Sequence, residues 1–181
     1  TPDGRRVMWA WFCTLDEAIN QKTVQSLPRE LSLGADGGLR IRPLRELETL
    51  RHDAVVLSDI TVTPEESSHS AEQARHLADL DGDAFELSVT VDRAETERKR
   101  FGLQLFAEED YPGLEIMIQP ETSTIRVGTT EAPFAIADLP EGEDIQLHIF
   151  VDKYLVEVFA NERQGLVAAH MNYQVARGFR A

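Results

Sequence analysis

The carboxylates are the first residues to consider for chemistry, because a hydrolase needs two of them across a scissile bond, or a nucleophile beside a base. The chain carries 32 Asp and Glu residues. Most lie in expected turns or on the polar face of expected strands, as do Glu65-Glu66 and Glu108-Glu109-Asp110. We interpret these acids as a solvated surface, and we assign no catalytic residue among them.

Asp152 and Glu157 differ from the other acids, because they bracket a tight turn inside the most apolar stretch of the chain, 147–159. A buried carboxylate requires hydrogen-bonding partners. We favour structural roles over catalysis for both: Asp152 accepts hydrogen bonds from turn amides, and Glu157 pairs with a base. On this interpretation, replacing Glu157 by Ala costs about 1–3 kcal/mol of stability.

The sequence predicts neither a metal site nor a cofactor. No H-x-H or H-E-x-x-H arrangement occurs, and no His, Cys and carboxylate cluster has metal-ligand spacing. His148 and His170 fall on expected strands where they could face each other, but we expect structural roles for them. Cys13 is the only cysteine, which excludes an intramolecular disulfide, and we interpret it as a small apolar residue. The other histidines are His52, His69 and His76.

Trp9 and Trp11 allow two hypotheses. Exposed tryptophans stack on the apolar face of sugar rings, which would indicate a carbohydrate-binding surface. Here both alternate along one face of an expected strand with Val7, and that pattern favours burial. We therefore expect them to be buried, and the sequence leaves the substrate-binding residues unknown.

Composition limits the function classes further. The chain has 181 residues, 42% of them hydrophobic, which is enough for one packed domain or for one domain plus part of another. Its formal charge of −14 argues against nucleic acid and anionic membranes as partners. The apolar runs are too short for a membrane-spanning helix, and we find no targeting segment, so the compartment stays open. Because the chain begins at Thr1 rather than Met, we expect a processed or excerpted product.

Alternating apolar residues dominate the chain and predict short strands. Turn residues such as Asp36-Gly37-Gly38 and Tyr111-Pro112-Gly113 separate them. The pattern predicts an all-β protein, an antiparallel two-sheet β-sandwich. We expect a short helix over 44–52, a short helix or irregular loop over 70–80, and no strand in the tail, 174–181. The expected strands cover residues 7–12, 39–42, 85–91, 101–105, 114–118, 125–127, 145–151, 154–158 and 166–170.

The segment LHIFVDKYLVEVFAN, residues 147–161, resembles the signature of the C-terminal β-sandwich module of glycoside hydrolase family 32, the fructan- and sucrose-cleaving enzymes. GRRVMWAWF, 4–12, is similar to the last strand of that family's five-bladed catalytic propeller. LPRELSLGADGGLRIRPLRELETLR, 27–51, is similar to the segment joining propeller to sandwich. FGLQLFA, 101–107, and PETSTIRVG, 120–128, are similar to the middle hairpins of the sandwich.

The resemblance implies a jelly-roll or lectin-like sandwich over 54–181, a connecting segment over 14–53, and a remnant propeller strand over 1–13. The family's catalytic motifs, N-D-P-N-G, R-D-P and E-C, do not occur in the chain. The chain departs from the family at Lys153-Tyr154, where Arg or Lys followed by Ser is usual. We also expect the final strand of the sandwich to be missing, and residues 7–12 to have no sheet of their own.

The resemblance therefore implies an accessory module of a fructan- or sucrose-cleaving hydrolase, not catalytic as this chain. Its implied partner is the propeller of the same polypeptide, with fructan or sucrose as a further candidate. Two alternatives stay open: an independent lectin-like module that binds glycans, and a protein–protein interaction sandwich. Self-association also stays open.

Overall fold

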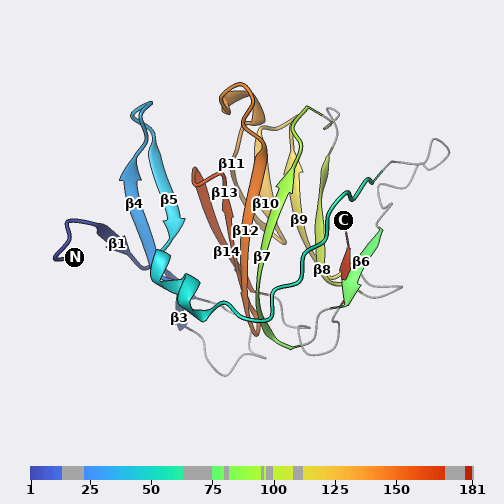
Figure 1. Cartoon of the computed structure of the whole chain (residues 1–181), viewed down its shortest axis with the longest axis horizontal. Coiled ribbons are helices and arrows are strands. Elements are labelled where there is room, and N and C mark those ends of the chain that lie inside the picture. Colours follow the sequence, from blue (N-terminus) through green and yellow to red (C-terminus); the bar gives the residue numbers. More distant parts are fainter. Residues whose placement is uncertain are drawn as a thin grey trace.

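Two antiparallel sheets facing each other form the centre of the molecule (Figure 1). The computed structural model describes residues 1–13, 23–62, 75–79, 82–94, 96, 100–107, 112–169 and 178–180. Apolar side chains from both sheets fill the space between them, so the expected all-β sandwich is confirmed. No helix in these ranges is long and apolar enough to cross a membrane.

The first sheet has four strands in the order β14-β13-β12-β7. In its register, Ile149 of β12 lies opposite Val158 of β13 and Leu87 of β7. Because side chains alternate along a strand, these three share the face that looks into the core. The strands are β7 (Ala84–Val91), β12 (Ile145–Asp152), β13 (Leu155–Ala160) and β14 (Gln164–Ala169).

The second sheet has six strands in the order β11-β10-β9-β8-β15-β6. Gly102 of β8 has no room for a side chain, because a Cβ atom there would lie 1.9 Å from the carbonyl oxygen of Ile116 on β9. The strands are β6 (His76–Asp79), β8 (Phe101–Ala107), β9 (Leu114–Gln119), β10 (Thr124–Val127), β11 (Thr130–Pro133) and β15 (Gly178–Arg180).

The core between the sheets consists of aliphatic side chains from the alternating positions. It is closed at one end by Phe134 and Leu139, which flank the short 3-10 helix η2 (Ile136–Asp138). Residues with no solvent exposure come from both sheets, namely Leu105, Ile116, Ile118, Ile125, Val127, Ile145, Ile149, Val156, Val158 and Ala160.

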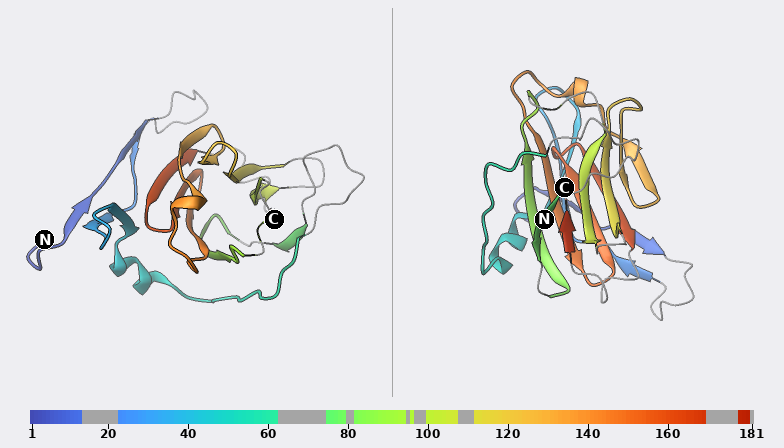
Figure 2. Two further views of the ribbon diagram at one scale, coloured as in Figure 1. Left: turned by 90° about the horizontal axis from the view of Figure 1, so that it is seen from above. Right: turned by 90° about the vertical axis from the view of Figure 1, so that its right-hand side faces the viewer.

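Two small N-terminal sheets lie outside the four-stranded sheet, on the side of β13 and β14 (Figures 1 and 2). One has the order β1-β4-β5 and the other pairs β2 with β3. A 3-10 helix, η1, follows them where the sequence predicts a short helix. The elements are β1 (Arg6–Met8), β2 (Trp11–Cys13), β3 (Thr23–Gln25), β4 (Arg29–Leu33), β5 (Leu39–Pro43) and η1 (Arg45–Leu50).

The expectation that residues 7–12 have no sheet of their own is wrong. The single expected strand is two strands, and both pair within this chain: Val7 lies opposite Glu30 on β4, and Phe12 lies opposite Val24 on β3. Partners from 23–33 pair with one edge of each strand, and the other edge of β1 and of β2 has no strand beside it among the described residues.

Two further expectations are corrected in the second half of the chain. The region 70–80, expected as a helix or loop, contributes β6. The tail, expected to form no strand, contributes β15, which pairs with β8 on one side and β6 on the other. Both are short, and a strand of three or four residues leaves too few alternating positions for a sequence signal. The domain boundaries and the missing final strand stay predictions.

Candidate functional site at the junction of the N-terminal strands and the sandwich

The outer face of the four-stranded sheet meets the N-terminal strands, and Glu157 lies in the middle of this contact. Val156 and Val158 point into the core, so the side chain of Glu157 between them points outward. All six residues of β13 are buried, including those on the outer face, because β5 packs over it and the Arg29 side chain of β4 reaches it.

A buried ion pair joins β4 to β13. Arg29 Nη2 lies 2.6 Å from Glu157 Oε2, and the Leu27 amide donates to Glu157 Oε1 at 2.5 Å. The Arg29 guanidinium also lies 5.2 Å from the centroid of the Phe159 ring, within cation–π range. Both charged side chains are almost fully excluded from solvent, with 5% and 2% exposure. The expectation that Glu157 pairs with a base is therefore confirmed.

Burial and hydrogen bonding act on Glu157 in opposite directions. Burial is the larger effect and raises the pKa of its carboxyl, while the Leu27 amide and Arg29 act to lower it. Arg29 Nε is buried with no hydrogen-bond partner among the described residues. A buried charge without its partner is costly, so each member of this pair requires the other.

Asp152 does not behave as expected. Its side chain is exposed at the end of β12, and it accepts no hydrogen bond from any residue that the structure describes. The turn after it is instead closed by the backbone, because the Lys153 amide donates to the Asp83 carbonyl at 2.6 Å. Because this main-chain hydrogen bond closes the turn, the turn does not require the Asp152 carboxylate, which remains in solvent.

A second group of ion pairs holds the N-terminal elements together. Glu30 Oε1 lies 2.5 Å from Arg42 Nη2, which ties β4 to β5. Arg5 reaches from the start of the chain to Glu46 on η1, at 2.6 Å. A hydrogen bond from Arg5 lowers the pKa of Glu46 to about 2. These pairs make β1, β4, β5 and η1 one connected layer.

A third group attaches the end of η1 to the sandwich. Arg51 donates to both carboxylate oxygens of Glu86, with Nη2 at 2.7 Å from Oε1, and His148 Nε2 contacts the same oxygen. Burial of Glu86 acts to raise the pKa of its carboxyl, but the hydrogen bonds from Arg51 and His148 outweigh it and lower this pKa. The contacts among Arg51, Glu86 and His148 therefore join the segment that follows η1 to β7 and β12.

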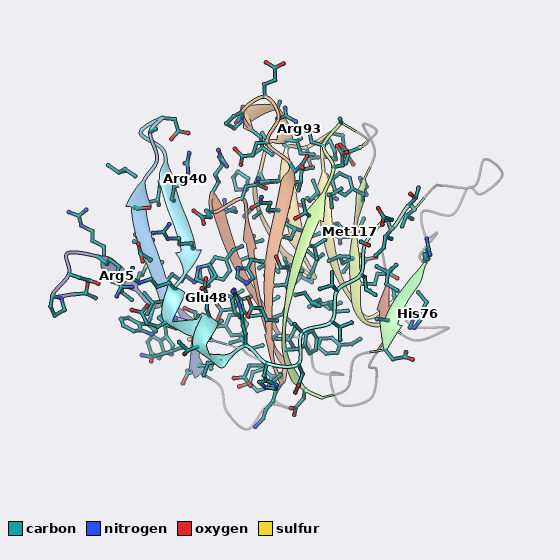
Figure 3. The ribbon with its side chains drawn as sticks, viewed as in Figure 1. Arg5, Arg40, Glu48, His76, Arg93 and Met117 are labelled. Atoms are coloured by element: carbon teal, nitrogen blue, oxygen red, sulfur yellow. The ribbon has the colours of Figure 1, made fainter. Side chains whose placement is uncertain are left out.

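Between η1 and the outer face of β12 the surface is hollowed, with a volume of about 290 Å³. The hollow has arginines and a glutamate on the η1 side and two rings on the β12 side. Figure 3 shows Glu48 on η1, below the end of β5. The lining includes Arg42, Arg45, Glu48, Arg51, His148 and Phe150.

This arrangement does not support hydrolysis. Glu30 and Glu157 are the buried carboxylates of the described residues, and an arginine neutralises each. Neither is free to act as an acid or a nucleophile. Within the same residues, no group of three His, Cys, Asp or Glu side chains is placed to hold a metal ion. The junction therefore has the chemistry of an attachment surface.

Trp9 and Trp11 are exposed, at 54% and 73%, so the prediction that they are buried is wrong. They lie where β1 ends and β2 begins, and the pairing of these strands with β4 and β3 fills one edge of each without covering the two rings. Cys13, at the end of β2, is also exposed.

The histidines and one arginine complete the account of the predicted residues. His52 and His76 are exposed, and His148 belongs to the Glu86 group. His69 and His170 lie outside the described residues, so a contact between His148 and His170 stays untested. Sequence reasoning missed Arg29. The signal was its alternation with Leu31 and Leu33, which places an arginine in phase with apolar residues.

Comparison with known proteins identifies this architecture. Residues 46–169 match the family model described as glycosyl hydrolases family 32, C terminal. The chain belongs to glycosyl hydrolase family 32. The match covers nearly all of η1 and every strand of the sandwich except β15, so the expected family is confirmed. The chain represents the family's C-terminal domain, which is not the catalytic part.

Relatives of this family 32 chain are much longer than it is. A probable sucrose-6-phosphate hydrolase of Psychromonas ingrahamii is 33% identical over 178 residues, which are 94% of this chain and 30% of that protein. A levanase of Bacillus subtilis is 27% identical over 188 residues, 91% of this chain and 26% of that protein. The chain thus spans about a third or less of the length of these curated relatives.

Solved structures show the same fold. Fructan 1-exohydrolase IIa from Cichorium intybus matches 99% of the chain with a TM-score of 0.69 and 18% identity, over 42% of its own chain. Sucrose-6-phosphate hydrolase from Lactobacillus gasseri matches 99% with a TM-score of 0.63 and 20% identity, over 38% of its chain. Both matches include the N-terminal strands as well as the family 32 sandwich.

Proposed function

We propose that this chain is the accessory C-terminal part of a sucrose- or fructan-cleaving enzyme, in which it stabilises a catalytic propeller of the same polypeptide. Its similarity to sucrose-6-phosphate hydrolases and levanases supports the substrate class. The observation that carries the proposal is the exposure of Trp9 and Trp11 beside strands β1 and β2, each of which pairs with one neighbour among the described residues and keeps one open edge.

Two exposed tryptophans on one short stretch favour an apolar partner. Aromatic side chains bury large areas and dominate the energetics of interfaces. Leu33 and Leu39, also exposed, lie opposite each other at the far end of the β4–β5 pair, where they form a separate apolar spot. On this proposal, residues 1–13 complete the propeller, and the tryptophans are covered by its neighbouring strands.

The junction explains how such a partner would gain stability. A retaining glycosidase holds two carboxyl groups about 5–5.5 Å apart, which requires a rigid frame. The N-terminal strands belong to the propeller on one side, and Arg29 and Glu157 fix them to the sandwich on the other. They therefore restrict the motion of the propeller. The sandwich then supports catalysis by limiting the motion of the propeller, and none of its side chains takes part in the reaction.

The first test is the size and activity of the native gene product, detected with an antibody against this chain. A five-bladed propeller adds about 200–250 residues or more. We expect a polypeptide far above 20.3 kDa that hydrolyses sucrose or levan, while the 181-residue chain alone is inactive. A native product near 20 kDa would contradict the proposal.

The second test places substitutions in the full polypeptide. We expect Trp9→Ala with Trp11→Ala to shorten the half-life of activity at elevated temperature by at least about tenfold, because an interface anchor is lost. Val55→Ala with Val56→Ala is the matched control, since these side chains are 83% and 85% exposed on another surface. Equal half-lives for the two double variants would exclude docking through the tryptophans.

A further inference from the structure

We propose that the hollow between η1 and β12 binds a short neutral saccharide. This role is separate from the stabilisation of a propeller and does not depend on it. The hollow, at about 290 Å³, lies at the lower end of the range for small-ligand sites, which suits a ligand of few sugar units.

The charges that line the hollow select the ligand class. Arg42, Arg45 and Arg51 supply donors, while Glu48 and Glu162 supply acceptors. Arg42 and Arg51 are already neutralised by Glu30 and Glu86, and Arg45 is offset by Glu48 and Glu162, so neither an anion nor a cation meets a strong net charge of opposite sign. A hydroxyl group both donates and accepts hydrogen bonds, so a neutral polyol pairs with both kinds of side chain.

Several of these groups keep hydrogen-bonding capacity for a ligand. Arg45 is 68% exposed and has only long ion pairs, at 3.5 Å to Asp3 and 3.9 Å to Glu46. Arg42 Nη2 pairs with Glu30, but Arg42 Nη1 lies 4.0 Å from Glu162. Glu48 lies 3.6 Å from Arg51, too far for a hydrogen bond. The rim is therefore polar and incompletely paired within the described residues.

The β12 side of the hollow supplies an apolar and fixed surface. The rings of His148 and Phe150 have centroids 4.5 Å apart, and both line the hollow. The C–H face of a sugar ring packs on such aromatic surfaces. Glu86 holds both His148 and Arg51, so the base of the hollow is ordered before a ligand arrives. Pre-ordering reduces the entropy lost on binding.

The test is an NMR titration of the 181-residue chain, which closes its own core, with sucrose and with short inulin oligosaccharides. We expect saturable shifts, with a Kd in the millimolar range, at the amides of Arg42, of 44–48 and of 148–150, and at the Arg51 side chain. Shifts confined to Trp9 and Trp11 would overturn this assignment, as would no shift with either sugar.

Substitutions and an anion control complete the test. Arg45→Ala and Glu48→Gln are on the exposed rim and leave folding intact, and we expect each to weaken binding by about three- to tenfold. Trp11→Ala, also exposed, is the matched control and leaves the Kd unchanged. Inorganic phosphate that displaces the sugar, or that binds more tightly than it, would contradict a neutral ligand. Because no propeller takes part, the result is independent of the proposed stabilising function.

Discussion

The two faces of the four-stranded sheet are built by the same strands but are held by different forces. On the inner face, β12 and β13 contribute fully buried aliphatic residues such as Ile149 and Val158. On the outer face, the same strands carry Glu157, His148 and Phe150, and they meet the N-terminal layer through ion pairs and rings. The inner face closes the domain, and the outer face attaches something to it.

This difference allows one face of the sheet to bind another segment while the other face maintains the fold. Apolar contacts are non-directional and grow with area, so the core tolerates no gap but needs no specific partner. A buried ion pair adds little net stability over apolar packing. Losing one member strongly destabilises the fold, however, because the other charge stays buried without a partner. The outer face therefore specifies which segment docks there, and the inner face supplies the free energy of folding.

The largest effect is expected in the core. Ile149→Ala removes buried methyl groups and leaves a cavity, so we expect it to lower the free energy of unfolding by about 4 kcal/mol. Urea denaturation followed by far-UV circular dichroism measures this value. A loss similar to that of Val56→Ala, whose side chain is 85% exposed, would contradict the assigned core.

The next effect is expected at the ion pair. Glu157→Ala leaves the Arg29 guanidinium buried and uncompensated, and we expect a loss of about 3 kcal/mol in the same assay. Replacing both residues by Met removes the charge together with its partner and is expected to recover most of this loss. If the double variant were as unstable as Glu157→Ala, the coupling between the two side chains would be disproved.

A smaller effect is expected at the Glu86 group. Glu86→Gln keeps the shape but weakens the bonds to Arg51 and His148, so we expect a loss of about 1 kcal/mol at pH 7. The group is partly solvated, and its energy is therefore well below that of the buried pair. Denaturation in 1 M NaCl is the control, because salt should reduce this difference more than that of Glu157→Ala.

The same group predicts how stability depends on pH. The pKa of Glu86 is lowered in the folded state, so the unfolded chain binds its proton first as the pH falls. Its contribution is complete above the ordinary glutamate pKa and is lost as the pH falls through the lowered value. We expect Tm to fall below about pH 5, and less steeply in Glu86→Gln. Burial raises the pKa of Glu157, which acts oppositely, so this test varies Glu86 alone. Parallel curves would contradict the assigned role of Glu86.

The smallest effect is expected at the tryptophans in the isolated chain. Trp9→Ala and Trp11→Ala remove exposed rings, so each should change the free energy of unfolding by less than about 0.5 kcal/mol. Acrylamide should quench the fluorescence of both rings readily. Strong protection from acrylamide in the dilute 181-residue chain would show that the rings are covered without a propeller.

The sandwich is predictable from the sequence because the core-facing positions of its strands are regularly apolar. Alternation in 85–91, 145–151 and 114–118 reports a face that is uniformly apolar, and the observed strands follow it. The family motif adds the identity of the strands, since V-E-V-F places one carboxylate between residues of the core. Glu157 was interpretable as paired because it lies in the most apolar stretch of the chain, where a buried carboxylate requires hydrogen-bonding partners.

The junction was less predictable because it depends on residues distant in sequence. The partner of Glu157 lies 128 positions earlier, and nothing local to Arg29 names it. The tryptophans alternate like core residues, but their exposure depends on what covers their strand, which local periodicity does not encode. The short strands β6 and β15 form because neighbouring strands offer hydrogen-bonding edges, a tertiary effect that outweighs weak local preference.

Hydrogen exchange in wild type and Glu157→Ala tests the central claim most directly, namely that the buried ion pair fixes the N-terminal strands to the sandwich. We predict that amides of β4 and β5 exchange faster in the variant by a much larger factor than amides of β8 and β9. Equal acceleration in all four strands, or unchanged exchange in β4 and β5, would contradict the claim.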